Sequence, residues 1–371
     1  MKYKLEDLCI YAKEKIEVEA LTDKNYISTE NMLPNKGGIT IATSLPSTAH
    51  TQKYQQFDIL VSNIRPYFKK IWFAEFDGGC SNDVLVFRAK EGVCKRFLYY
   101  VLANDAFFDY SMATSKGTKM PRGDKAAIMK YDVPDFTYEE QEKIAGILNA
   151  LDRKIQLNAE INNNLEQQAQ AIFKSWFIDF EPFSNRKPSD WSVSTLGNVS
   201  IMGAGGDKPQ NVSPIKTDLY EYPIYSNGLS NEGLYGFTDK PKISEESVTV
   251  SARGTIGFVC LRHIPYVPIV RLVTLIPETE IISAKYLYLW LKQLHITGTG
   301  TTQQQLTVPN FQKTEILVPS QEIVTLFTAT VEPIFEKIWA NQNENEKLSS
   351  LRDTLLPKLM SGELDISDID I

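Results

Sequence analysis

Two stretches of this chain, 183 residues apart, carry the same seam of mostly apolar residues. In both stretches the members of the seam alternate three and four residues apart, from Leu148 to Trp176 and from Val331 to Leu359. That spacing places the members on one face of a helix and is typical of a coiled coil. A helix cannot bury such a face by itself. The two stretches are therefore expected to form long helices that pair with each other.

Both seams contain asparagine at the same two positions, Asn158 and Asn162 in the first and Asn341 and Asn345 in the second. An amide at such a position costs stability but fixes the register, because only another polar group satisfies it there. Parallel pairing would set Asn158 against Asn341, whereas antiparallel pairing would set it against Asn345. We expect the antiparallel arrangement, because a head-to-tail duplication closes naturally with pseudo-two-fold symmetry. The alternative is two ordinary amphipathic helices with coincidental asparagines.

The repeat extends beyond the helices. Five short segments of the first half reappear in the same order in the second half: Tyr3–Leu8 as Trp191–Leu196, Ile59–Phe73 as Val248–Val259, Lys95–Leu102 as Ala284–Leu291, Ser115–Asp124 as Thr297–Gln305, and Tyr131–Ile144 as Ile316–Val324. An internal repeat of this kind indicates a duplicated architecture.

Strand-like runs such as "FDILVSNI" alternate with helical runs such as "CKRFLYYVLANDAFFDYSM". We therefore expect an α+β protein with two duplicated, mixed α/β domains, separated by two long helices that pair as an antiparallel coiled coil. Thr137 and Glu140 form a capping-box signature, and the first helix should run to about Phe177. The expected segments are a first domain at 1–135, a first helical region at 136–183, a second domain at 184–320 and a second helical region at 321–371.

Composition narrows the classes of function. The net charge is −7, but residues 1–135 carry +2 and residues 186–319 carry +1, so the acidic excess lies on the helical segments. The two domains can therefore present a local basic face. Four cysteines without CxxC spacing and three scattered histidines argue against a disulfide framework or a metal site. There is no apolar run of membrane length and no signal-peptide core, so we expect a cytoplasmic protein without membrane contact.

The sequence shows no phosphate-binding loop of the P-loop type and no combination of nucleophile, base and orienting residue. Asp58, Asp77 and Asp83 lack the flanking residues of a metal-dependent nuclease and are interpreted as ordinary loop acids. The run Val308–Phe311 is interpreted as a strand edge. The chain thus looks like a recognition and scaffold protein and not like an enzyme, with no metal or cofactor of its own.

Two loops of the first domain collect basic side chains that suit contacts with DNA phosphates and guanine edges. They are Arg65, Lys69, Lys70, Lys116, Lys119, Arg122 and Lys125. The equivalent loops of the second domain contain the single cation Arg253 and the polar run Thr301, Thr302, Gln303 and Gln304. A glutamine amide can pair with N6 and N7 of adenine. The polar loops occur at matching places in the two domains but differ in charge. This difference favours two domains that recognise different DNA sequences over loops that are only exposed to solvent.

Five segments are informative when taken together: the openings "YKLEDL" and "WSVSTL", and the runs "TYEEQEKIAGILNALDRKI", "NNLEQQAQAIFKSWFIDFEPF" and "LRDTLLPKLMSGEL". With these segments the chain resembles the specificity (S) subunits of type I restriction-modification systems. The resemblance covers essentially the whole chain. It implies two target-recognition domains, each followed by a conserved helical region. Each domain would read one half of a bipartite site in double-stranded DNA, and the paired helices would set the spacing.

The resemblance also implies partners. In that family the helices dock two methyltransferase subunits, which carry S-adenosylmethionine and methylate adenine, and two motor-nuclease subunits can join to cleave unmodified DNA. No cofactor is expected in this chain, and no catalytic residue is carried over. The sequence leaves three alternatives open: a recognition subunit of a type II system with a fused methylase and nuclease, a coiled-coil scaffold that does not bind DNA, and an enzyme with an unrecognised site.

Overall fold

The computed structural model describes residues 2–298 and 305–364. The chain divides into two compact units, one of residues 1–159 and 342–371 and the other of residues 160–341. Two long helices, α5 (Tyr138–Phe177) and α9 (Gln321–Ser361), contribute to both units. Each unit therefore contains one mixed domain and one half of each long helix. The domain boundaries expected at residues 135, 183 and 320 stay predictions.

The first unit contains two four-stranded sheets and one separate strand pair. The first sheet has the antiparallel order β2-β9-β6-β7, and the second has the order β3-β5-β8-β4 with β4 parallel to β8. The pair joins β1 to β10. The strands are β1 (Lys2–Lys4), β2 (Cys9–Tyr11), β3 (Lys15–Glu17), β4 (Tyr26–Ile27), β5 (His50–Tyr54), β6 (Ile59–Ser62), β7 (Ile71–Phe73), β8 (Gly78–Cys80), β9 (Val84–Ala89) and β10 (Asp132–Pro134). The helices are α1 (Leu5–Leu8), η1 (Val18–Ala20), η2 (Pro66–Phe68), α2 (Lys95–Ala103), α3 (Asp105–Ala113) and α4 (Lys125–Ile128).

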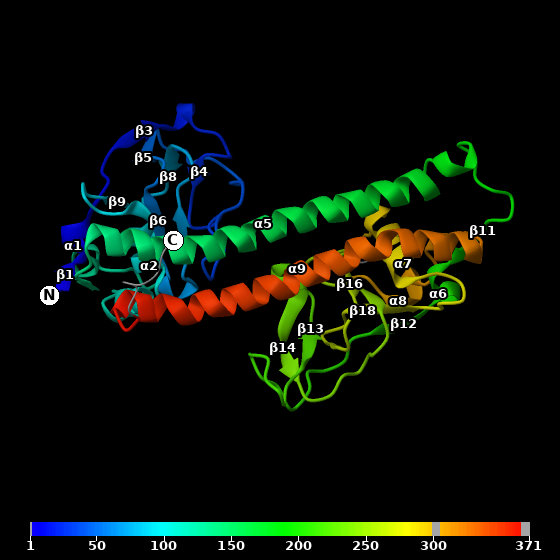
Figure 1. Ribbon diagram of the computed structural model, residues 1–371. Coiled ribbons are helices and arrows are strands. Elements are labelled where there is room, and N and C mark those ends of the chain that lie inside the picture. The colour runs from blue at the N-terminus through cyan, green and yellow to red at the C-terminus, as the bar shows by residue number, and fades with distance from the viewer. Residues whose placement is uncertain (1, 299–304, 365–371) are drawn as a thin grey trace. The chain divides into compact units, whose positions relative to one another are not determined.

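The core of the first unit joins the first sheet to the long helices. Phe87 of β9 and Phe97 of α2 are buried in one cluster with Leu148 of α5 and Leu359 of α9. Figure 1 shows the last turns of α9, in red, beside the first turns of α5 and this domain. The outer ends of both heptad seams are thus buried against the domain as well as against each other, which anchors the domain to the helix pair.

The second unit repeats this plan. Its antiparallel sheet has the order β12-β18-β15-β16, a three-stranded sheet has the order β14-β13-β17, and β11 pairs with β19. The strands are β11 (Ser192–Thr195), β12 (Ser200–Ala204), β13 (Tyr222–Tyr225), β14 (Leu234–Thr238), β15 (Ser247–Val250), β16 (Val259–Arg262), β17 (Val267–Pro268), β18 (Val273–Pro277) and β19 (Glu315–Val318). The helices are η3 (Glu181–Phe183), α6 (Leu196–Val199), η4 (Ser230–Gly233), α7 (Ala284–Gln293) and α8 (Val308–Phe311).

The expected duplication is confirmed by the order of the elements. In each domain a strand and a one-turn helix come first, and a four-stranded antiparallel sheet follows with matching strand order. A helix, α2 or α7, then comes before a one-turn helix, α4 or α8, and the last strand leads into a long helix. The additional sheets differ, since one has four strands and the other three. The domains therefore share a scaffold and differ in what is attached to it.

The antiparallel pairing of α5 and α9 is confirmed by contacts inside each unit. In the first unit Asp152 of α5 pairs with Arg352 of α9, while the later residue Asn158 meets the earlier residue Asn345. In the second unit the backbone carbonyl of Ile338 accepts a hydrogen bond from Asn162, and the rings of Phe173 and Phe327 lie 5.8 Å apart between centroids. In both units, residue numbers rise along one helix as they fall along the other.

Local predictions were confirmed at the start of α5 and in the run after Cys94, and wrong at Val308–Phe311. The backbone N–H of Thr137 donates to Glu140, and the backbone N–H of Glu140 donates to the Thr137 hydroxyl, as in a capping box. The run after Cys94 is helical as predicted, and it divides into α2 and α3 because Asn104 is extended and its side chain caps α3. Val308–Phe311, interpreted above as a strand edge, is the one-turn helix α8, in which the proline lies in the first turn where its missing N–H costs little.

Within the described part of the chain, no helix is both long enough and apolar enough to cross a membrane.

Candidate nucleic-acid interface

The two basic loops predicted in the first domain form one surface. Loop 63–70 follows β6, and loop 115–125 follows α3. The backbone N–H of Arg65 donates to the carbonyl of Pro121 over 2.8 Å, and the N–H of Gly123 donates to the carbonyl of Asn63 over 3.2 Å. Two backbone hydrogen bonds between Lys116 and Arg122 close the second loop on itself. Segments far apart in the sequence are therefore fixed side by side.

The turn that presents Arg65 is held from both sides. Arg65 and Lys69 flank η2, and both have left-handed backbone conformations, with φ of 50° and 51°. Non-glycine residues adopt this conformation at a cost and keep it where the surroundings impose it. Here the carbonyls of Phe68 and Lys69 accept hydrogen bonds from the N–H groups of Asn35 and Lys36. The turn is thus clamped between two loops.

Two of the predicted cations at this turn are engaged by the protein itself. Lys69 and Lys36 both pair with Asp105 at 2.8 Å. Partial burial alone would raise the pKa of Asp105, but hydrogen bonds from the two lysines outweigh it and lower that pKa. Lys70 donates to the carbonyl of Thr29 over 2.6 Å, and burial lowers the pKa of its ammonium group. Lys69 and Lys70 therefore help to hold the loop in place.

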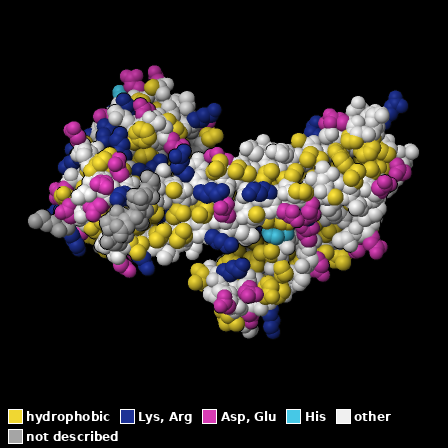
Figure 2. All heavy atoms as spheres, in the orientation of Figure 1, with side chains coloured by type: hydrophobic (Ala, Val, Ile, Leu, Met, Phe, Trp, Pro, Cys, Tyr) yellow, Lys and Arg dark blue, Asp and Glu magenta, His cyan; other side chains and the backbone are white. Residues whose placement is uncertain are grey.

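Two cations of the second loop also have carboxylate partners. Lys116 pairs with Asp124 at 2.6 Å, and Arg122 pairs with Asp83 at 3.1 Å. The side-chain hydrogen bond from Lys116 lowers the pKa of Asp124, as do the N–H groups that this carboxylate caps at the start of α4. With these ion pairs, the surface that the two loops form has mixed charge and is not a uniformly basic patch. Figure 2 likewise shows blue and magenta side chains interspersed on the visible face of this domain.

The remaining predicted cations of the first domain lack such partners. Lys119 and Lys125 are exposed, and Arg65 is half-buried. None of the three makes an ion pair with any residue in the described ranges 2–298 and 305–364. These three side chains are therefore the ones most available to phosphates or bases.

In the second domain the loop 251–258 follows β15 and is braced in a similar way. The N–H of Leu306 donates to the carbonyl of Ala252 over 3.0 Å, and the N–H of Ala252 donates to the side chain of Asn227 over 2.7 Å. Arg253 is exposed, and its guanidinium donates to the side chain of Gln305 over 3.0 Å. The predicted contacts Thr301, Thr302, Gln303 and Gln304 lie outside the described residues.

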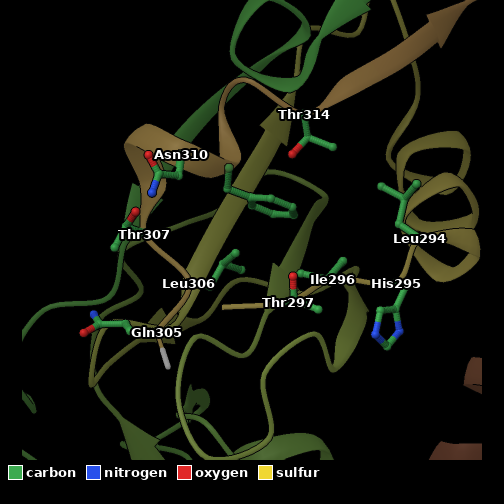
Figure 3. Close-up of a pocket in the computed structure, with 10 residues that line it drawn as sticks. Leu294, His295, Ile296, Thr297, Gln305, Leu306, Thr307, Asn310 and Thr314 are labelled. Atoms are coloured by element: carbon green, nitrogen blue, oxygen red, sulfur yellow. The ribbon is translucent and has the colours of Figure 1, made fainter. Parts of the chain in front are cut away.

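A pocket of about 250 Å³ lies beside this loop. Figure 3 shows Thr307 and Asn310 on one side of it and His295 on the other, with Leu306 between them. Polar side chains at the rim and apolar side chains at the centre suit a stacked or partly buried group. Among the described residues no cluster of three or more His, Cys, Asp or Glu could hold a metal ion.

The acids considered for a nuclease have separate structural roles. Asp58 is buried and pairs with Arg88, and Asp83 pairs with Arg122. Asp77 accepts a hydrogen bond from the backbone N–H of Gln56. These carboxylates hold loops and strands to one another.

Sequence reasoning missed the residues that join the loops. No sequence motif marks these residues, which are Asn63, Gly123, Asn35 and Lys36. A Cβ atom at Gly123 would lie 2.8 Å from Oδ1 of Asn63 and 2.9 Å from Oγ of Ser111. A larger residue at Gly123 would therefore force neighbouring side chains such as Asn63 and Ser111 to move.

Asparagine side chains also meet across the helix pair. In the first unit Nδ2 of Asn158 donates to Oδ1 of Asn345, and in the second unit Nδ2 of Asn341 donates to Oδ1 of Asn162 over 2.8 Å. Asn158 and Asn341 are each 1% exposed. In each unit a buried asparagine is thus hydrogen-bonded across the helix pair to a half-buried one. Their predicted role in fixing register stays a prediction.

Comparison with known proteins gives one consistent result. A family model for the type I restriction modification DNA specificity domain matches residues 1–167 and 188–349. The specificity subunit of the type I restriction enzyme HindI from Haemophilus influenzae is 27% identical over 98% of this chain and 99% of its own length. The MjaIX specificity subunit from Methanocaldococcus jannaschii is 27% identical over 76% of this chain and 71% of its own. The crystal structure of a type I S subunit from M. genitalium has a TM-score of 0.60 at 18% identity, covering 97% of this chain and 96% of that chain, which supports the fold.

Proposed function

The chain belongs to the type I restriction-modification DNA specificity family, and we propose from this that it is the subunit that selects the DNA target of such a system. Each domain reads one half of a bipartite site in double-stranded DNA. The helix pair sets the distance between the halves. The type II alternative is not favoured, since the family model and both relatives are of type I.

One observation carries this proposal. In each domain a loop follows the third strand of the four-stranded sheet, β6 or β15, and is bonded through its backbone to a second loop. The scaffold under the loops is the same in the two domains, whereas the side chains on them differ. A common scaffold with different loop side chains is what two readers of different sequences require.

Partners supply the chemistry in this proposal. Two methyltransferase subunits dock on the helical regions and bring S-adenosylmethionine, and two motor-nuclease subunits can join them. This chain contributes recognition and no catalytic residue. Because its net charge is −7, we propose that the methyltransferase subunits supply a large part of the phosphate contacts, so that binding of the assembled complex weakens steeply with salt.

The proposal is tested by mapping adenine methylation across the host genome with and without this gene. We expect one gapped, two-part motif to lose its methylation when the gene is deleted and to regain it when the gene is restored. If methylation stays unchanged, the purified chain and its methyltransferase are tested on the same genomic DNA. Failure to methylate any motif there would contradict the proposal.

A further inference from the structure

An arginine lies in the corresponding loop of each domain. Arg65 comes three residues after the end of β6, and Arg253 comes three residues after the end of β15. These strands are third in the matching orders β2-β9-β6-β7 and β12-β18-β15-β16. By strand register Ile59 of β6 corresponds to Val248 of β15, so the two arginines lie in corresponding loops, one position apart.

The backbone next to each arginine is fixed by the neighbouring loop. Asn63, two residues before Arg65, accepts a hydrogen bond from Gly123, and Ala252, directly before Arg253, accepts one from Leu306. Arg65 also donates its own N–H to Pro121. A side chain that selects a base must have a fixed origin, because a shift of about 1 Å is enough to break a bidentate contact.

Arg65 differs from the other cations of its surface in what surrounds its charge. Lys69, Lys116 and Arg122 each have a carboxylate partner at 2.6–3.1 Å. The Nε atom of Arg65, in contrast, is buried and has no hydrogen-bond partner among the described residues. No carboxylate among the described residues pairs with Arg65, so its positive charge is not neutralised within the described part of the protein. Its guanidinium can therefore donate to a group outside the protein.

Arg253 is charged, exposed and oriented by a neutral group. The structure records for its guanidinium one hydrogen bond within the described ranges, from Nη2 to Oε1 of Gln305. That contact orients the guanidinium without neutralising it. Its planar fork matches O6 and N7 of guanine, which is the commonest specific contact in the major groove.

We propose that Arg65 and Arg253 are the base-reading residues of the two domains, each recognising a guanine in its own half of the target. Lys69, Lys70, Lys116 and Arg122 hold the loops of the first domain, and the exposed Lys119 contacts phosphate. This assignment rests on the proposed function. It adds which side chains recognise a base and which ones hold the loops in position.

The test uses the complex with its methyltransferase and a plasmid library in which each half-site is randomised in turn. The variants are Arg65→Lys and Arg253→Lys, which keep the positive charge and remove the fork, with Lys119→Ala as the matched phosphate-contact control. We expect each arginine variant to lose roughly ten- to a hundredfold of its preference for one guanine, in one half-site only. The control should weaken methylation of all sequences alike and leave the motif unchanged.

Three results separate the possibilities. If Arg65→Lys keeps the full motif, or weakens all sequences uniformly, the base-reading assignment is wrong while the proposed function stands. If the wild-type complex itself selects no gapped motif, the proposed function fails and the assignment fails with it. A further variant, Arg65→Gln, offers an amide in place of the fork. Loss of the guanine preference in this variant, with normal binding to the methyltransferase, separates base reading from a folding defect.

Discussion

Asn158 of α5 and Asn345 of α9 are joined by a hydrogen bond of 2.9 Å between Nδ2 of the first and Oδ1 of the second. The same nitrogen of Asn158 lies 2.8 Å from a carboxylate oxygen of Glu344, and Nδ2 of Asn345 donates to the backbone carbonyl of Ile155. Oδ1 of Asn158 is buried and has no partner among the described residues. The pair therefore satisfies most of its polar groups in this register, and a slip of one turn would leave them unpaired.

Replacing both residues with leucine should raise stability and loosen the register. The double variant Asn158→Leu with Asn345→Leu removes a polar pair and an unpaired oxygen from the seam, and such replacements are often stabilising. We expect the melting temperature to rise by roughly 2–4 °C for each kcal/mol gained. In the complex, methylation of a library with varied spacer length should extend to more than one spacer.

The single variants provide the control. Asn158→Leu alone leaves Asn345 without its partner and should cost about 1–3 kcal/mol. A double variant that melts earlier than wild type and still selects a single spacer would show that the asparagines do not set the register. The pair Asn162 and Asn341, which meets in the second unit, should respond in the same direction.

Gly123→Ala should damage recognition of one half-site. A Cβ atom there would lie 2.8 Å from Oδ1 of Asn63 and from Cδ1 of Ile128, so these side chains would have to move where the two loops of the first domain meet. We expect a loss of about 1–3 kcal/mol in stability from overpacking. Methylation should become less selective in one half of the motif and remain selective in the other.

Gly203→Ala is the matched control for this change. Gly203 lies in β12 of the second domain, and nothing lies within 4 Å of a Cβ atom added there. This variant should retain both half-sites. If Gly123→Ala also retains both at full selectivity, the close approach of the loops is not required for reading DNA.

His263 should make the stability of the second unit depend on pH. Its ring stacks on Trp339 with centroids 4.1 Å apart. Burial of the stacked face, together with the positive charges of Lys285 and Arg262, lowers its pKa to about 4. In the unfolded chain the pKa is about 6.5. Between those values the unfolded state binds a proton that the folded state does not, so the stabilisation is complete above pH 6.5 and is lost as the pH falls towards 4.

Comparison with His263→Gln isolates this effect, because carboxylates also titrate in the acid range. We expect wild type to lose on the order of 1 kcal/mol more than the variant between pH 7.5 and pH 5, since the partly exposed ring is screened by solvent. Urea unfolding followed by tryptophan fluorescence would measure it. Equal losses in the two proteins would mean that the imidazole does not change its protonation on unfolding in this range.

The helix pair could be predicted from the sequence because its signals are local and repeated. The seam, the capping box at Thr137 and the two asparagine positions are each visible within a few residues, and the copy in the second half supplies the partner. The one-turn helix α8 could not be predicted in this way. It depends on Pro309 in the first turn and on the burial of Phe311, which only the folded domain provides.

The candidate interface could be predicted only as a set of loops. Composition identified the basic side chains, but the bond between Arg65 and Pro121 joins segments that nothing in the sequence connects. The carboxylates that engage Lys69 and Lys116 are likewise supplied by tertiary contacts. Charge counts therefore overstate the basic character of this surface, since several of its cations are already paired.

Exchange of the first domain should change one half-site only. A chimaera that replaces residues 1–135 with the corresponding domain of another specificity subunit keeps α5 and α9, and with them the spacing. The foreign domain must still fit the helix pair, where Tyr100 donates to Asp152 over 2.7 Å and Asp152 also pairs with Arg352. A donor with tyrosine at the position of Tyr100 should fold with near-normal stability, and one with phenylalanine should lose about 1 kcal/mol, because the part-buried carboxylate of Asp152 loses one of its two partners. Methylome sequencing should show a new sequence in one half, an unchanged sequence in the other and the same spacer.

The reciprocal exchange of residues 184–320 should change the other half. A change in both halves from either exchange would show that the two domains do not read DNA independently.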